Sequence, residues 1–246
     1  MNKALSFLRR SLIPVLLVVS TGVLLSSCLK DKDGNNPDIP AGALMSFNLA
    51  PDQPGLLIRL SGNLLTQTPL AYTNYSGAYQ SIYAGNRQID AFNVNNNKQI
   101  SASSFNFETG KYYSLFITGA DSAYRNIVAV DNFDSLSAAD GKAYVRYINA
   151  ITDSVNAPTV TIAAGGNNVV NEPAPYTRVS EFTAINPGSI SIAVKNNNGV
   201  DASRTISVEQ KKIYTILLVG KPGAADANQQ VQIKFIGNGT LSDDNK

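Results

Sequence analysis

The sequence of 246 residues predicts an all-β protein, with two tandem immunoglobulin-like or transthyretin-like β-sandwiches after a leader and a short tether. Two observations lead to this prediction. Short segments of alternating apolar residues are separated by Gly, Asn and Pro, and no window of helix length carries a clean apolar stripe. The segments also recur in the same order after about 100 residues, which is the size of one small sandwich.

Three segments show the strand pattern clearly. Residues 142–149 and 189–194 alternate between apolar and polar side chains, as half-buried strands do. Residues 212–219 form a nearly continuous run of β-branched and aliphatic side chains, which is typical of a central strand buried on both faces. We therefore expect residues 212–219 in the middle of a sheet.

The internal repeat is visible in four pairs of segments. Residues 111–119 recur as 212–220, displaced by 101 positions, and residues 70–76 recur as 174–180, displaced by 104. Ile82, Gly85 and Ile89 fall on Ile185, Gly188 and Ile192, and the opening segment 43–47 corresponds to 143–147. Small changes of displacement at turns, with the order kept, indicate two copies of one domain.

These pairs set the expected organisation. Copy one should span residues 43–130 and copy two residues 142–237, joined by a polar linker at 131–141 and followed by a polar tail at 238–246. Tandem domains on a polar linker commonly share little interface, so each copy is expected to own its core and to fold alone.

The N-terminal residues have the order of a signal peptide. Lys3, Arg9 and Arg10 precede an apolar run at 12–25, which is shorter than the roughly 20 residues that a membrane-spanning helix needs. The run ends in Leu-Ser-Ser-Cys28, which resembles the lipobox of bacterial lipoproteins. We expect residues 1–27 to be removed, Cys28 to carry the lipid, including palmitate, and 28–42 to form a polar tether. The alternative is an ordinary signal peptide followed by a free cysteine.

Composition excludes several kinds of chemistry. Removal of the leader leaves 17 Lys and Arg against 18 Asp and Glu, so no basic surface for nucleic acid is expected. The sequence has no His and no Trp, and Cys28 is its only cysteine. The usual general base, the commonest metal ligand and disulfides are therefore absent, and we expect no catalytic residues, no metal and no cofactor.

Four segments resemble a known family: residues 141–150, 176–182, 186–188 and 212–217 are similar to domain of unknown function 4397. That family is common in lipoproteins of Bacteroidota, and the resemblance implies an immunoglobulin-like sandwich without an established activity. It covers nearly all of 43–237 and is closer in copy two. Copy one departs at Ala84, where copy two has Pro187, and its opening strand lacks a counterpart of Arg146.

Aromatic residues in copy one are the candidate ligand contacts. Tyr72, Tyr75, Tyr79 and Tyr83 have the spacing of one helical face, but copy two places Tyr176, Val179, Phe182 and Ile185 at or beside these positions. Apolar bulk rather than a ring is therefore required, which favours core packing. Tyr75, Tyr79 and Tyr83, which are unique to copy one, remain possible ligand contacts.

Polar clusters mostly have simple structural interpretations. Asp131, Asp134 and Asp140 lack the ligand spacing of a calcium loop and indicate a solvated linker. Residues 95–97 and 196–199 occupy the same place in each copy and predict hairpin turns, because Asn and Gly tolerate positive φ.

Two short patterns concern export and modification. Residues 30–33 (Lys-Asp-Lys-Asp) resemble the acidic export signal of Bacteroidota surface lipoproteins, with a generic charged tether as an equal alternative. Ser122, Ser135 and Ser154 each follow Asp and precede an apolar residue, as in the O-glycosylation pattern of that phylum; about one such match is expected by chance.

These features together predict a lipid-anchored outer-membrane protein, surface-exposed rather than periplasmic, that acts as a non-catalytic binding or structural module. Its partners would be the membrane, through the N-terminal lipid, and a glycan or another envelope protein. The alternative is a subunit of a fimbria-like assembly, with residues 231–236 as an exchangeable edge strand, although Lys234 favours pairing within the chain. A carboxylate hydrolase is disfavoured because the mature chain has only four Glu residues and no acid pair recurs at a matched position.

Overall fold

The computed structural model describes residues 39–152 and 156–242. The leader, Cys28, tether residues 29–38 and Ser154 lie outside the described residues, so the predictions made for them stay predictions. Ala41 and Gly42, which were expected in the tether, instead begin the first strand, β1 (Ala41–Asn48). The chain from Pro40 onward forms one compact unit. Within the described residues, no helix is long and apolar enough to cross a membrane.

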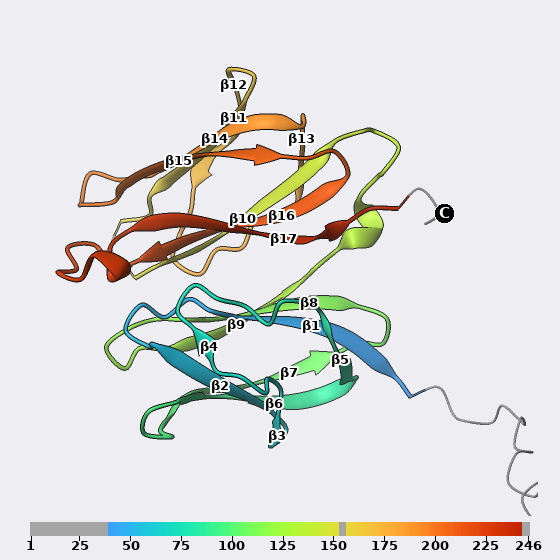
Figure 1. The fold of residues 1–246 in the computed structure, drawn as a ribbon, viewed down its shortest axis with the longest axis vertical. Helices are drawn as coiled ribbons and strands as arrows, with labels where there is room; N and C mark the ends of the chain where they lie inside the picture. The colour runs from blue at the N-terminus through green and yellow to red at the C-terminus, as the bar shows by residue number, and fades with distance from the viewer. Residues whose placement is uncertain (1–38, 153–155, 243–246) are drawn as a thin grey trace, which may run out of the picture. The chain divides into compact units, whose positions relative to one another are not determined.

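Each copy is a sandwich of two sheets (Figure 1). In copy one the sheets have the orders β5-β1-β8-β9 and β3-β2-β6-β7, and β4 also pairs with β2. These strands are β1 (Ala41–Asn48), β2 (Gly55–Leu60), β3 (Asn63–Leu64), β4 (Leu70–Ala71), β5 (Gln80–Tyr83), β6 (Gly85–Asn93), β7 (Gln99–Phe107), β8 (Tyr112–Thr118) and β9 (Arg125–Val130).

Copy two repeats the arrangement with sheets β13-β10-β16-β17 and β12-β11-β14-β15. Its strands are β10 (Ala143–Ile151), β11 (Thr159–Ala164), β12 (Asn167–Pro173), β13 (Thr183–Ile185), β14 (Gly188–Lys195), β15 (Asp201–Val208), β16 (Lys212–Gly220) and β17 (Gln232–Thr240). Short 3₁₀ helices occupy Phe133–Ser135 (η1) and Ala227–Gln229 (η2). The predicted all-β fold with two sandwiches is confirmed.

The first strand of each copy has the same unusual position. β1 pairs parallel with β8 and antiparallel with β5, and β10 pairs parallel with β16 and antiparallel with β13. In a constant-type immunoglobulin domain the first strand lies in the same sheet as the second. Here β1 and β2 lie in different sheets, so the order departs from that type.

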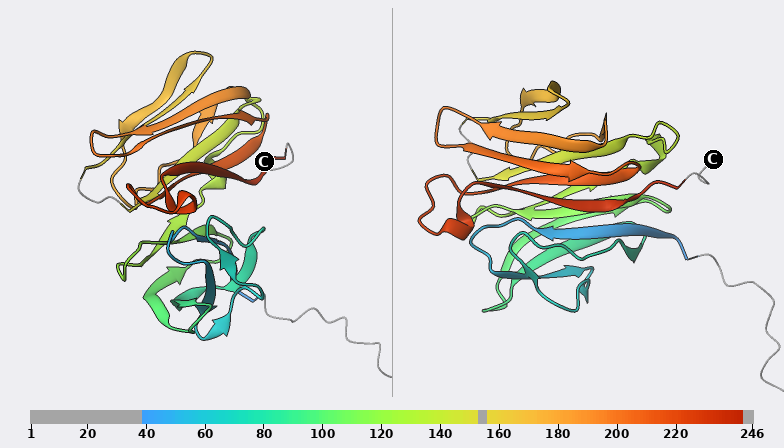
Figure 2. Two further views of the ribbon diagram at one scale, coloured as in Figure 1. Left: turned by 60° about the vertical axis from the view of Figure 1, so that its left-hand side comes forward. Right: turned by 45° about the horizontal axis from the view of Figure 1, so that its top comes forward.

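Three apolar clusters hold the sheets together. One lies inside copy one and includes Leu44 and Leu115, and a second lies inside copy two and includes Val145 and Ile216. In Figure 2 each sandwich can be followed as two facing sheets. The third cluster joins the copies and combines residues of β1 and β8 with residues of β10, β16 and β17; its fully buried members include Phe47, Phe116 and Leu217.

The expectation that the copies share little interface is therefore wrong. Strands β8 and β16 are buried almost throughout because one face packs inside their own sandwich and the other packs against the other copy. The continuous apolar run at 212–219 correctly predicted a central strand. It also required a covering for the second face, and the other copy supplies that covering.

The displacements between matched repeat segments that the sequence indicated hold in the structure, except at the opening strands. Gly119 and Gly220, displaced by 101, both have φ near +115°, and a Cβ on either would lie 2.3 Å from a backbone oxygen, so only glycine fits. The side-chain amides of Asn48 and Asn149, displaced by 101, donate to the backbone carbonyls of Leu70 and Ala174, which are also matched positions of the repeat. The opening strands thus correspond with a displacement of 101, not 100. The counterpart of Arg146 in copy one is therefore Met45 rather than Ser46. A shift of one residue exchanges the two faces of a strand.

Both predicted hairpin turns are present. Residues 95–97 lie between β6 and β7, and residues 196–199 lie between β14 and β15. Asn97 (φ 53°) and Gly199 (φ 87°) adopt the positive φ for which Asn and Gly are suited. The final strand β17 pairs with β16 over its length and continues past residue 237 to Thr240, so residues 232–236 of the predicted edge strand complete their own sheet and Val231 precedes it.

Asp131 is buried, although it was expected to lie in a solvated linker. Its carboxylate is buried and lies 2.5 Å from the guanidinium of Arg146, which is buried as well. Asp134 and Asp140 are exposed, as expected. The linker composition is polar on average, but its first residue faces inward between the two copies.

Candidate functional site: a cleft where the two copies meet

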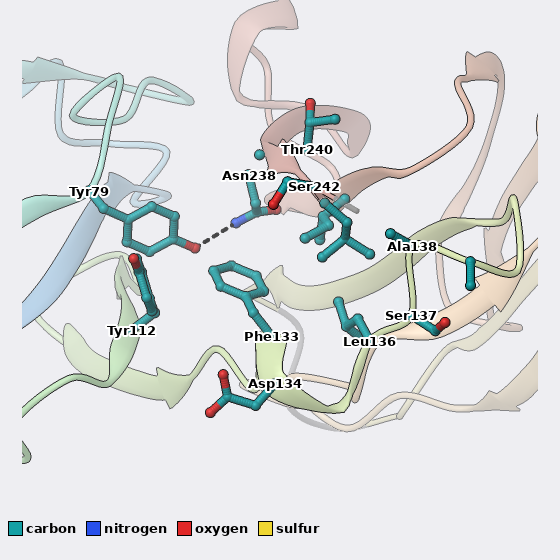
Figure 3. Close-up of a pocket in the computed structure, with 14 residues that line it drawn as sticks. Tyr79, Tyr112, Phe133, Asp134, Leu136, Ser137, Ala138, Asn238, Thr240 and Ser242 are labelled. Carbon is teal, nitrogen blue, oxygen red and sulfur yellow. Dashed lines mark hydrogen bonds between the residues drawn. The ribbon is translucent and has the colours of Figure 1, made fainter. Parts of the chain in front are cut away.

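A cleft of about 980 Å³ lies beside the ends of β8, β9, β16 and β17 (Figure 3). This volume is at the upper end of the range for small-molecule sites. The cleft draws residues from copy one, the linker and copy two, namely Tyr79, Tyr112, Phe133, Asp134, Leu136–Ala139, Ile213 and Asn238–Ser242. It therefore exists only because the copies pack together.

Three aromatic rings form one wall of this cleft. Tyr79 and Tyr112 meet edge to face at 5.2 Å, and Phe133 lies 5.7 Å from Tyr79 and 5.3 Å from Tyr112. These are favourable aromatic geometries. Tyr112 as a residue is 44% exposed, and Figure 3 shows the three rings gathered on one side of the cavity. The wall thus presents apolar ring surface to solvent.

The hydroxyl of Tyr79 fixes that wall in place. It donates a hydrogen bond to the Asp131 carboxylate and accepts one from the side-chain amide of Asn238 at 3.1 Å. Burial, together with the charge of Asp131, raises the pKa of Tyr79 well above its ordinary value. Tyr79 therefore stays protonated and remains a donor throughout the physiological range.

A buried polar network lies behind the aromatic wall. Arg146 pairs with Asp131, and its guanidinium also donates to the hydroxyls of Ser114 (2.8 Å) and Thr215 (3.0 Å). Its guanidinium carbon lies 4.4 Å from the ring centroid of Phe182. The network links β8, β10, β16 and the linker, so it holds the two copies in one arrangement and makes the cleft a preformed site.

The structure separates the three candidate tyrosines. Tyr75 stacks on Phe47 with ring centroids 5.7 Å apart, and it belongs with Tyr79 to the apolar cluster between the copies. Tyr83 is 60% exposed and has the guanidinium of Arg87 5.6 Å from its ring centroid. Of the three, Tyr79 lines the cleft, and the three tyrosines do not form a single ligand face.

Sequence reasoning missed the other components of the cleft. Phe133 belongs to the stretch interpreted as a polar linker, and Tyr112 corresponds to Ile213, which suggested strand packing only. An aromatic residue within an otherwise polar linker was the available signal. Asn238 was assigned to the polar tail, although its side chain is buried and bonded to Tyr79 and Thr215.

The candidate glycosylation sites within the described residues are both exposed. Ser122 lies in the turn between β8 and β9, and Ser135 lies in η1, where its hydroxyl donates to the carbonyl of Asn132 at 2.7 Å. Exposure is compatible with modification. O-glycosylation of these serines stays a prediction.

The cleft offers little reactive chemistry. Asp134 is its one charged lining residue, and it lies 3.4 Å from Lys111 at the surface. Over residues 39–152 and 156–242, no group of three His, Cys, Asp or Glu residues is placed to hold a metal ion. Rings, amides and hydroxyls are suited to holding a ligand.

The fold and the cleft define a class of protein: a tandem β-sandwich with a preformed cavity where its two repeats meet. The chain belongs to the family described as Domain of unknown function (DUF4397), whose model matches residues 43–155 and 143–238. The family resemblance deduced from sequence is thereby confirmed. No curated protein matches the sequence significantly.

Solved structures give distant likenesses. A family 26 carbohydrate-binding module from Eubacterium rectale Amy13K, in complex with maltoheptaose, is 10% identical, covers 82% of this chain and 99% of its own, and has a TM-score of 0.27. A candidate cell adhesion protein from Bacteroides eggerthii is 10% identical over 83% and 98%, with a TM-score of 0.23. A family 41 carbohydrate-binding module from streptococcal virulence factors, studied for α-glucan recognition, is 9% identical over 78% and 96%, with a TM-score of 0.23. Likenesses at this level identify no ligand.

Proposed function

We propose that this protein is a non-catalytic carbohydrate-binding module, held by the lipid on Cys28 at the outer face of the outer membrane. The observation that carries the proposal is the cleft with the exposed ring of Tyr112 beside Phe133. Sandwich proteins commonly place binding residues in loops at the ends of their sheets, and the linker and strand ends form this cleft.

The chemistry of the cleft suits a sugar. The C–H face of a pyranose ring is apolar and packs on an aromatic ring, while its hydroxyls need hydrogen-bonding groups around that ring. The hydroxyl-bearing residues Ser137, Thr240 and Ser242 and the carboxylate of Asp134 lie around the aromatic wall. The low charge of the lining favours a neutral ligand over an anionic one.

The first prediction concerns Tyr112. Tyr112→Ala should weaken binding of neutral oligosaccharides at least tenfold, which corresponds to about 1.4 kcal/mol, because it removes the most exposed ring of the wall. The native protein would be screened on an array of neutral oligosaccharides, and the bound glycans would then be titrated calorimetrically. Tyr83→Ala is the matched control, since it removes an exposed tyrosine outside the cleft. Equal binding by the native protein and Tyr112→Ala would contradict a site in this cleft.

Support for the location comes from the sequence before the sandwiches. A single acyl chain gives reversible membrane binding, whereas the two or three chains on a lipoprotein cysteine give a stable anchor. The Lys-Asp-Lys-Asp segment at 30–33, which resembles an export signal, supports surface export. The tether at 28–42 would then carry the two sandwiches away from the membrane.

The second prediction concerns Cys28. Cys28→Ser should leave the protein unprocessed or unanchored, so that it no longer enters the detergent phase on phase separation. On intact cells, added protease should cleave the native protein. Partition of Cys28→Ser into the detergent phase would contradict lipid anchoring, and full protection of the native protein would contradict surface exposure.

A further inference from the structure

We propose a second binding site, in copy one, that accepts one neutral sugar residue. The site is a pocket of about 370 Å³ between the loop at 66–70 and the segment at 74–80. It shares no lining residue with the cleft between the copies, so it stands independently of that site. Its volume falls within the range of small-molecule sites.

Two buried polar atoms in the wall of this pocket have no partner within the described residues. They are the hydroxyl oxygen of Thr66 and the side-chain oxygen of Gln80. Thr66 as a whole residue is 5% exposed. The amide nitrogen of Gln80 donates to the carbonyl of Leu65 at 3.0 Å, which orients the amide. A buried polar group without a partner destabilises the folded protein, so each such group calls for an explanation, of which a bound ligand is one. Both atoms are closed to solvent in the free protein, so a ligand that brings hydroxyl groups would satisfy them once the loop at 66–70 shifts to admit it.

The remaining walls specify the kind of ligand. None of the nine lining residues is charged, which disfavours phosphate, carboxylate and cationic ligands. Tyr75 also lines the pocket, and its ring stacks on Phe47 at an interplanar angle of 18°. The backbones of Phe47 and Tyr75 also pair in an isolated antiparallel β-bridge, which fixes the position of Tyr75. Hydroxyls, amides and one fixed ring together suit a sugar residue.

Copy two differs at the matched positions. Thr66 lies in the loop between β3 and β4, whereas in copy two the strand β12 continues without a break to Pro173, directly before Ala174, the counterpart of Leu70. At the displacement of 103, Thr183 stands where copy one has Gln80. The unsatisfied pair is thus a property of copy one rather than of the repeat.

Thr66→Val is the decisive variant because it removes the hydroxyl without changing the shape. If that hydroxyl lacks a partner in the free protein, the variant should melt at the same temperature as the native protein or higher, while its affinity for the ligand falls at least tenfold. The probes are the methyl glycosides of glucose, galactose, mannose and N-acetylglucosamine, titrated to millimolar concentration and followed by backbone amide NMR shifts. Shifts should cluster at residues 66–70 and 74–76.

Two further variants separate the possible outcomes. Thr109→Val, in an exposed turn that lines neither cavity, should bind as the native protein does. Tyr112→Ala should also keep these shifts, so a failure of the cleft proposal would not affect this result. The proposal is overturned if no glycoside shifts these residues or if Thr66→Val binds as tightly as the native protein. A fall in melting temperature of Thr66→Val, with no glycoside bound by the native protein, would show that the pocket holds only water.

Discussion

At the scale of single residues, Arg146 distinguishes the two copies. Its counterpart in copy one is Met45, which packs in the apolar cluster between the sandwiches. Arg146 instead reaches Asp131 and the hydroxyls of Ser114 and Thr215. A buried ion pair adds little net stability over an apolar pair, but loss of one partner leaves an uncompensated charge.

The third prediction follows from this asymmetry. Arg146→Met should lower the free energy of unfolding by about 3–5 kcal/mol, because Asp131 remains buried and unpaired. Methionine is the appropriate replacement, since Met45 fills the corresponding place in copy one. Addition of Asp131→Asn should recover part of the loss, because it removes the remaining charge. Urea denaturation measures both effects, and a cost below about 1 kcal/mol for Arg146→Met would show that the carboxylate is not buried.

At the scale of elements, β16 shows how one strand serves two cores. Ile216 and Leu218 point into copy two, while Leu217 packs in the cluster between the copies. The sequence of β16 correctly indicated burial on both faces. It did not identify what covers the second face, because alternation shows that a side chain is buried but not which element buries it.

The fourth prediction uses this alternation. Leu217→Ala should destabilise the protein by about 2–5 kcal/mol, the usual cost of a buried leucine-to-alanine change. Ile216→Ala serves as the comparison and should cost a similar amount, since both residues are fully buried. Chemical denaturation checks both variants. If Leu217→Ala were nearly neutral while Ile216→Ala was costly, the outer face of β16 would be open to solvent.

At the scale of the whole molecule, the linker packs against both of the sandwiches that it connects. Asp131 lies in the buried network, and Phe133 contributes to the aromatic wall and contacts Phe182 at 5.7 Å. Separation of copy one (43–130) from copy two (142–237) would therefore expose the shared cluster and leave Arg146 without its acid.

The fifth prediction concerns cooperativity. The two sandwiches should unfold together in a single calorimetric transition, because each covers an apolar face of the other. The excised segments 43–130 and 142–237 should be less stable than the intact chain and prone to associate through the uncovered faces. Two separate transitions, with each excised segment as stable as it is within the chain, would restore the original expectation of independent domains.

The sequence by itself determined the fold class, the repeat, the hairpin turns and the central position of β16. Each of these depends on local alternation, on turn residues such as Asn97 and Gly199, or on similarity between segments, and all three can be read along the chain. The sequence also showed that Arg146 has no counterpart in copy one. It did not show the partner of Arg146, because a polar linker indicates exposure on average and one buried aspartate does not change that average.

Only the tertiary structure decided that the outer faces of the β1–β8 and β10–β16 strand pairs pack together. That packing also forms the cleft, which is lined by Tyr79, Tyr112, Phe133 and Asn238. These residues come from the segment just before β5, from β8 and β17 and from the linker, and no sequence spacing relates them. A one-residue shift in the matching of the opening strands also remained undetected until the strands were paired. The physical reason is common to these cases: burial of the second face of a strand is a long-range event, decided by what other surface is available to exclude water.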